Sequence, residues 1–242
     1  MISMENKPEI LYEDNHLLVA LKPPGFLSQP GKKNTADMLT YLKEYIKNKY
    51  GKPGNVYLGL VHRLDMNVGG VMVFARTSKA ASRLSEAIRE RNFWKEYLAV
   101  VEGKLDTGTR IVLEDNLVKN SVSLKGQISE SGKKSSLSYV CLANKKINEK
   151  WISLVRISLG SGRFHQIRVQ FSSRNHPIMG DTKYGSQLRI GSNSLSLWAY
   201  HLAFLHPVTG EKLSFQSLPS IGGFAYFQDI IVKTGPVDDN IN

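Results

Sequence analysis

The sequence has little of what stabilises a secreted protein or places one in a membrane. Cysteine is nearly absent: Cys141 is the only one among 242 residues, so no internal disulfide can form, and a reducing compartment is expected. No apolar run reaches the roughly 18 residues that a membrane span needs. Residues 1–16 carry acids in place of the basic region and apolar core of a signal peptide. We therefore expect a cytoplasmic protein without membrane association.

Patterns that bind metals or cofactors are missing as well. The six histidines are not spaced as in helical zinc sites, and a single cysteine cannot form a thiolate cluster. The glycine-rich stretch from Gly160 to Arg168 lacks the Gly-Lys-Ser/Thr ending of a nucleotide-binding loop. The sequence therefore predicts no metal ion and no cofactor.

Acidic residues are scarce compared with basic ones. The chain has 32 Lys and Arg against 21 Asp and Glu, a formal charge of +11. Residues 151–180 contain four arginines, two histidines and no acid. A basic surface that serves only solubility would be spread more evenly, so this clustering favours a nucleic-acid partner. Oligomerisation leaves no signal in the sequence, and we expect a monomer with no obligate protein partner.

The apolar pattern along the chain predicts a single α+β domain around a mixed, mostly antiparallel sheet with flanking helices. Residues 1–8 are expected to form an N-terminal arm, 9–233 the domain and 234–242 a flexible tail. Residues 104–135 are expected to form hairpins or a mobile flap. Helices are predicted to begin after Thr35 or Asn34, after Thr77 or Ser78, and at His165. Strands are predicted near residues 10–12, 17–21, 56–61, 71–75, 94–101, 137–142, 151–159, 196–204 and 213–215.

Asp65 is the only acidic residue between positions 45 and 85. It lies between the apolar residues 56–61 and the turn at Gly69-Gly70. An aspartate in a turn often has only a local backbone role. The alternative is that this single carboxylate works alone as a nucleophile or base, because no second acid is near enough in sequence to share a metal.

The segment Gly160 to Arg168 opens a predicted helix with glycines, arginines and a histidine. The free N–H groups at the start of a helix bind anions, and Arg163 and Arg168 would reinforce that attraction. A glycine turn followed by an ordinary amphipathic helix explains the same residues. By itself, this segment is a weak phosphate-site signal.

Taken together, the two segments resemble the RluA-type pseudouridine synthases. His62-Arg63-Leu64-Asp65 matches the first family signature, and Gly162 to Arg168 matches the Gly-Arg-x-His-Gln-Ile/Leu-Arg of the second. The resemblance runs in order from about residue 9 to 219. Further matching stretches are Tyr12 to His16, Lys22 to Gly25, Lys95 to Tyr97, His176 to Gly185 and His206 to Glu211.

The resemblance implies the pseudouridine synthase fold with a central active-site cleft, and isomerisation of specific uridines in structured RNA (rRNA or tRNA). It implies that Asp65 either attacks the ribose C1′ or removes a ribose proton, two routes that remain open here. Arg168 is the expected counter-charge of Asp65, with a phosphate contact as its alternative. Tyr97 is expected to stack on the uracil or help move the C5 proton. The residues expected to line the pocket or bind RNA are His62, Arg63, Leu64, Lys22, Arg163, His165, Gln166 and Ile167.

The sequence departs from the family pattern at Val68-Gly69, where Thr-Ser is usual, and at Trp198, where many relatives have His. The chain starts at the catalytic domain, so the small S4-like N-terminal domain of many relatives is expected to be absent. The loss of two loop hydroxyls keeps a second hypothesis open, an RNA-binding or RNA-folding protein with impaired catalysis. A metal nuclease or a DNA-binding protein is a third hypothesis, based only on basicity and histidines.

Overall fold

The computed structural model describes residues 7–31, 35–188 and 195–235, so most of the predicted arm and tail lies outside the described residues. The chain forms two compact units. Strands β5 (Phe93–Glu102) and β10 (Leu197–Leu205) each contain residues of both units. Among the described residues, the first unit consists of residues 7–31, 35–94 and 199–217, and the second of residues 95–188, 195–198 and 218–235.

The first unit is built on strands in the order β1–β2–β4–β10, with β3 beside β4 and β11 beside β10. The pairs β1/β2, β2/β4, β3/β4 and β10/β11 are antiparallel. All seven residues of β4 are buried, as the uninterrupted apolar run predicts. The bounds of these strands are β1 (Glu9–Glu13), β2 (Leu17–Lys22), β3 (Gly59–Leu60), β4 (Gly69–Ala75) and β11 (Lys212–Gln216).

Two helices belong to the first unit, α1 (Met38–Tyr50) and α2 (Ser78–Arg89). Helix α2 begins where the sequence predicts: the Thr77 hydroxyl accepts a hydrogen bond from the Ala80 amide (3.1 Å). The cap predicted for α1 at Thr35 or Asn34 is wrong. Asp37 caps this helix by accepting from the Thr40 amide (2.9 Å), because its carboxylate satisfies a free N–H at the helix start.

The predicted strand 56–61 is mostly wrong, because only Gly59–Leu60 pairs as β3. These two residues lie opposite Ala75 and Phe74 at the end of β4. Strand β2 pairs with β4 from Gly70 to Ala75 on one edge, and β10 neighbours β4 as well. Since a strand has two edges, β3 and β10 share the second one. In the register of β3, residues 56–58 would lie opposite residues 76–78, beyond the end of β4, so they have no strand to pair with.

The second of the two glycines after the Asp65 loop, Gly70, is required by its backbone and its surroundings. Its φ is +128°, and a Cβ at this position would lie 2.2 Å from the carbonyl oxygen of Ala199 on β10. Any other residue would combine an unfavourable backbone conformation with a clash against backbone. The backbones of β4 and β10 can therefore approach each other closely only because Gly70 has no side chain.

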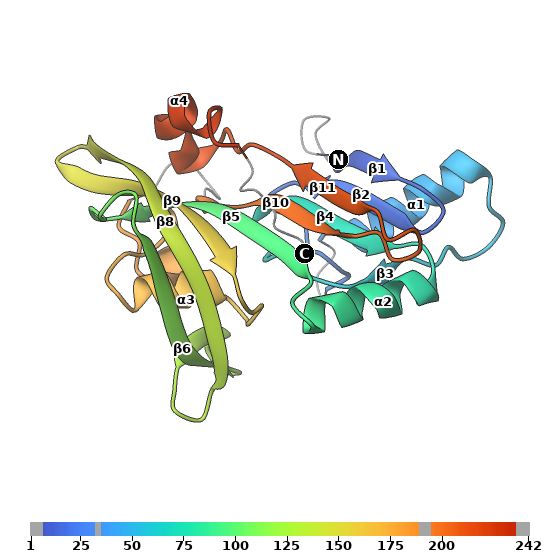
Figure 1. Ribbon diagram of the computed structural model, residues 1–242, viewed down its shortest axis with the longest axis horizontal. Coiled ribbons are helices and arrows are strands. Elements are labelled where there is room, and N and C mark those ends of the chain that lie inside the picture. Colours follow the sequence, from blue (N-terminus) through green and yellow to red (C-terminus); the bar gives the residue numbers. More distant parts are fainter. Residues whose placement is uncertain (1–6, 32–34, 189–194, 236–242) are drawn as a thin grey trace. The chain divides into compact units, whose positions relative to one another are not determined.

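The second unit contains strands in the order β5–β9–β8–β6–β7, and all of these neighbours are antiparallel. The region 104–135 forms hairpins, one of the two outcomes expected. Figure 1 shows β6 and β8 running side by side as a long ribbon, with α3 next to it. The bounds are β6 (Arg110–Asn120), β7 (Lys125–Ile128), β8 (Lys133–Ile147), β9 (Lys150–Leu159), α3 (Gln166–Ser172), the 3₁₀ helices η2 (Thr182–Tyr184) and η3 (Gly222–Phe227), and α4 (Gln228–Ile231).

The predicted α+β class is confirmed: the described residues contain eleven strands and four α-helices. The helix predicted at His165 begins at Gln166, with His165 itself as the N-cap in a left-handed conformation. In the described part of the chain, no helix is both long and apolar enough to cross a bilayer.

Candidate functional site

The predicted reactive residue, Asp65, lies on the loop between β3 and β4 in the first unit. The residue before it is fixed by a buried serine: the Ser28 hydroxyl donates to the Leu64 carbonyl (2.8 Å) and accepts from the Leu64 amide (3.0 Å). The Ser28 side chain, on the loop between β2 and α1, therefore satisfies both main-chain groups of Leu64. Asp65 itself is partly buried, and Leu64 is buried at 8% exposure.

The residue after Asp65 is fixed by the same stretch of chain, residues 22–28. The Met66 carbonyl accepts from the Gly25 amide (2.8 Å) and from the Lys22 ammonium (2.9 Å). A turn hydrogen bond from the Val68 amide to the Asp65 carbonyl (3.1 Å) closes the loop. The backbone of Asp65 is thus held on both sides, which limits how far its carboxylate can move.

Lys22 is completely buried, although its type is among the least often buried. Its ammonium donates to the Pro23 carbonyl (3.0 Å) and the Met66 carbonyl. Burial lowers the pKa of Lys22 to about 7, while the nearby Asp65 carboxylate acts in the opposite direction. The sequence predicts Lys22 among the residues that line the pocket or bind RNA, and the structure places its ammonium against the Met66 carbonyl of the Asp65 loop.

Ser28 was not identified from the sequence, and its contacts lead to a prediction. Ser28→Ala should lower kcat about 10- to 100-fold with little change in KM, because it frees the main chain next to Asp65 and a small displacement of a reacting group is costly. It should also lower the free energy of unfolding by about 1–3 kcal/mol, since two buried Leu64 groups lose their partner. Steady-state kinetics and urea unfolding measure these effects. Ser123→Ala, at an exposed serine, is the control, and an unchanged kcat in the Ser28 variant would contradict the prediction.

The burial of Lys22 also predicts that the free energy of unfolding depends on pH. Its pKa is lower in the folded protein than the usual 10.5, so between about pH 7 and pH 10.5 the unfolded chain binds more protons. The free energy of unfolding should therefore gain up to about 1.4 kcal/mol per pH unit from this residue as pH rises. The difference between the wild type and Lys22→Met, measured by denaturant unfolding at several pH values, isolates that contribution. A difference that stays constant across this pH range would show that Lys22 keeps its ordinary pKa.

The other residues of the first signature have different environments. The His62 Nε2 accepts a hydrogen bond from the Val73 amide (3.1 Å), and its ring packs against Phe93 at 5.7 Å. This arrangement anchors the start of the loop to β4. Arg63 is exposed, so its guanidinium is accessible to a partner.

Arg168 lies on α3 in the second unit and forms a bidentate ion pair with Asp181. Its Nε and Nη2 donate to the two carboxylate oxygens at 2.7 and 2.8 Å. The Tyr184 ring lies 4.9 Å from the guanidinium carbon. Both side chains of the pair are nearly inaccessible, at 11% and 1%. The fork geometry orients Arg168 strongly, and Asp181 is a positioning residue that sequence reasoning missed, although it lies in a stretch that matches the family.

Gln166 and Ile167 are buried, at 3% and 5% exposure. The Gln166 amide oxygen accepts from the Ser161 hydroxyl (2.8 Å) and the Arg163 amide (3.1 Å). Its amide nitrogen donates to the Ser136 carbonyl (3.0 Å). Gln166 therefore fixes the turn before α3, and the structure does not place it at an RNA-accessible surface as expected.

The remaining predicted residues of the second unit are Tyr97, Arg163 and His165. Tyr97 is buried at 7% on β5, opposite Ile157 of β9. Arg163 is exposed, and its Nε donates to the Lys134 carbonyl (3.4 Å). His165 bonds through Nδ1 to the Tyr184 hydroxyl (2.8 Å). These three residues and Arg168 therefore belong to one unit, while Asp65 belongs to the other; their joint action stays a prediction.

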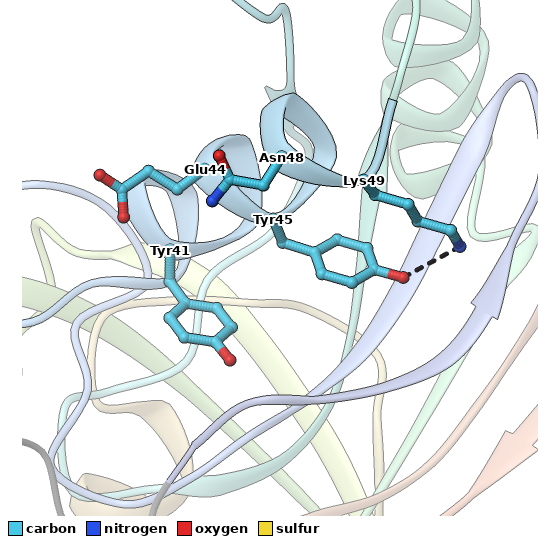
Figure 2. Close-up of a pocket in the computed structure, with 5 residues that line it drawn as sticks. All are labelled: Tyr41, Glu44, Tyr45, Asn48 and Lys49. Atoms are coloured by element: carbon cyan, nitrogen blue, oxygen red, sulfur yellow. Dashed lines mark hydrogen bonds between the residues drawn. The ribbon is translucent and has the colours of Figure 1, made fainter. Parts of the chain in front are cut away.

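A hollow of about 420 Å³ on α1 contains none of the predicted site residues. Figure 2 shows its lining, with a hydrogen bond between the Tyr45 hydroxyl and Lys49 (3.0 Å). Within the described residues, no group of three or more His, Cys, Asp and Glu side chains could hold a metal ion. The lining residues of the hollow are Tyr41, Glu44, Tyr45, Asn48 and Lys49.

Comparison with known proteins identifies many relatives. Residues 16–173 match the family model described as RNA pseudouridylate synthase. An uncharacterized RNA pseudouridine synthase of Aquifex aeolicus is 33% identical over 89% of this chain and 71% of its own length. Ribosomal large subunit pseudouridine synthase C of Escherichia coli is 34% identical over 86% of this chain and 65% of its own length.

Two solved structures share the fold. Human RNA pseudouridylate synthase domain containing 1 superposes with a TM-score of 0.69 over 98% of this chain and 100% of that one, at 20% identity. Human RNA pseudouridylate synthase domain containing 4 gives a TM-score of 0.68 over 86% and 87%, at 24% identity. The family model and the sequence relatives, together with the two signatures, confirm the resemblance seen in the sequence: the chain belongs to the RNA pseudouridylate synthase family.

Proposed function

We propose that this protein converts specific uridines of structured RNA to pseudouridine, with Asp65 as the reactive carboxylate. The observation that carries the proposal is the Asp65 loop, in which Leu64 and Met66 are tied to Ser28, Gly25 and Lys22 on either side of the family aspartate. Such preorganisation serves a group that must meet a reacting atom in a narrow range of positions.

The reaction breaks the glycosidic C1′–N1 bond, turns the uracil and forms a C1′–C5 bond; C5 then loses its proton to solvent, and N1 takes up a proton. In this proposal Asp65 attacks C1′ or removes a ribose proton, and both routes need an ionised carboxylate. Arg168, aligned by Asp181, provides the counter-charge in an active-site cleft. Tyr97 contacts the uracil. Because a paired base must leave its stack, at a cost of a few kcal/mol, phosphate contacts by Arg63 and Arg163 offset that cost.

Val68-Gly69 replaces the usual Thr-Ser of the family, and from the sequence this keeps open an RNA-binding protein with impaired catalysis. The structure weakens the support for that alternative. The loop is closed by the Val68 amide, which bonds to the Asp65 carbonyl, and the Val68 side chain is buried at 2%. The turn therefore forms without the two hydroxyls of the usual Thr-Ser. We propose an active enzyme on this basis.

The substrate proposed first is large-subunit ribosomal RNA, because the names of the relatives from Escherichia coli and Haemophilus influenzae include that subunit; transfer RNA is the second choice. We further propose that the protein works in the cytoplasm as a monomer, with neither a metal nor a cofactor.

The test uses purified protein with ribosomal and transfer RNA labelled with tritium at uracil C5, in the presence of a chelator. Tritium release at discrete sites, together with pseudouridine found by mass spectrometry, is the expected result. Binding without release from either RNA would favour the impaired binder. Cleavage of RNA that stops when chelator is added would favour a metal nuclease.

A further inference from the structure

Phe164 is a large apolar side chain exposed at the surface of the second unit. It stands between Arg163 and His165 in the second signature, and 37% of its surface is accessible. Its ring stacks on the His165 ring, with centroids 3.8 Å apart and an interplanar angle of 21°. An exposed aromatic ring with one face already supported is a suitable surface for stacking a planar group.

The support beneath Phe164 is rigid. His165 has a left-handed backbone (φ +53°), which a histidine adopts only when its surroundings hold it there. Its Nδ1 bonds to the Tyr184 hydroxyl (2.8 Å), and the same hydroxyl accepts from the Gly126 amide on β7 (2.6 Å). The β6–β7 hairpin thus fixes the ring on which Phe164 rests.

A cation lies over the Phe164 ring. The Lys119 ammonium, from β6, is 4.7 Å from the ring centroid. Lys119 is exposed, and it forms no ion pair with a carboxylate of the described residues. Its long side chain can move aside at little cost, so the ammonium can pair with a phosphate while a base occupies the ring face.

The surrounding charge suits a polyanion. Residues 117–134, which form the end of β6, all of β7 and the start of β8, contain four lysines and one acid, Glu130. Arg163 reaches this segment through its bond to the Lys134 carbonyl, and Lys183 reaches it through a bond to the Leu124 carbonyl (2.6 Å). An aromatic ring set among uncompensated cations is the combination that binds single-stranded nucleic acid.

We infer that Phe164, supported by His165 and accompanied by Lys119, is a stacking platform for an unpaired nucleobase of the RNA strand. The inference rests on the proposed function, which makes RNA the substrate, and adds a base-binding position in the second unit. Phe164 provides the ring face and Lys119 the phosphate contact. Since every base has a π-face, the platform accepts any base and fixes the path of the strand rather than its sequence.

The test measures the affinity of the full-length protein for a labelled 12-nucleotide oligouridylate by fluorescence anisotropy. An oligonucleotide of the same length made of abasic nucleotides provides the same phosphates without bases. Phe164→Leu keeps an apolar side chain and removes the ring. We expect it to weaken oligouridylate binding roughly 5- to 100-fold and to leave binding of the abasic strand unchanged, while Phe164→Trp restores the affinity.

Lys119→Met separates charge from stacking. It should weaken binding of both strands and reduce the slope of log K against log salt by about 0.7, the value for one phosphate contact on a single strand. The inference is overturned if Phe164→Leu weakens both strands equally or neither. It is also overturned if a 12-residue oligoglutamate binds with the same dependence on Phe164, which would indicate an acidic-peptide surface.

These outcomes are independent of the proposed function. If Phe164→Leu binds RNA normally while the wild type makes pseudouridine, the platform is wrong and the function stands. If the wild type makes no pseudouridine but Phe164→Leu loses affinity for oligouridylate alone, the platform stands and the function is wrong.

Discussion

Asp65→Asn is expected to abolish pseudouridine formation. The asparagine side chain has nearly the same shape but no negative charge, so it can neither attack C1′ nor remove a proton. We expect a loss of at least about 10⁴-fold in single-turnover tritium release, the scale on which removal of a catalytic nucleophile lowers kcat. Product formation close to the wild-type rate would exclude Asp65 as the reactive group.

Fold and RNA binding should survive this substitution. The loop is held through the main chains of Leu64 and Met66, and neither contact involves the Asp65 carboxylate. The melting temperature and RNA affinity of Asp65→Asn should therefore stay close to those of the wild type. Asp106→Asn removes the same charge from an exposed position and is the matched control, with full activity expected.

Asp181→Ala is expected to have the second largest effect. It removes the bidentate carboxylate of Arg168, a pair that is nearly inaccessible to water. Loss of one partner of such a pair lowers the free energy of unfolding by about 3–5 kcal/mol, because the other charge stays buried. Activity should fall further than the stability loss explains, since the guanidinium is no longer oriented. Denaturant unfolding and single-turnover kinetics measure the two effects.

Two variants sharpen this test. Asp229→Asn breaks an exposed ion pair with Lys145, and it should change stability and activity little. The double variant Arg168→Leu, Asp181→Leu removes both buried charges, so it should be more stable than Asp181→Ala yet inactive. If Asp181→Ala unfolds like Asp229→Asn, the buried pair is not what holds α3 and η2 together.

The sequence predicted strands and helices well where a single local signal decides them. The buried run of β4 and the Thr77 cap are such cases. Prediction was wrong where a tertiary partner decides the outcome. Residues 56–58 have a strand pattern, but in the register of β3 they would lie opposite residues 76–78, beyond the end of β4 and at the start of α2. The cap of α1 depended on which of several polar residues stood one position before the first turn.

In the candidate site, too, the sequence reveals what a local motif carries and misses what depends on a distant partner. The signatures predict roles for Asp65 and Arg168 from residue type and order alone, and those roles stay predictions. They did not reveal Ser28, because a serine 36 positions before its partner has no local pattern. They also did not reveal that Lys22 and Gln166 are buried, because the burial of a polar side chain depends on whether carbonyls and amides from distant segments satisfy it.

On either side of Asp65 the loop is held through the peptide groups of Leu64 and Met66, and this affects how the loop can change in evolution. The carbonyl of Met66 receives two hydrogen bonds, while its side chain is 43% exposed. Natural variation at this position can therefore alter what the protein presents beside its reactive carboxylate without loosening that carboxylate's anchor. Position 66 is accordingly a good site for randomised libraries that seek altered RNA preference at undiminished turnover.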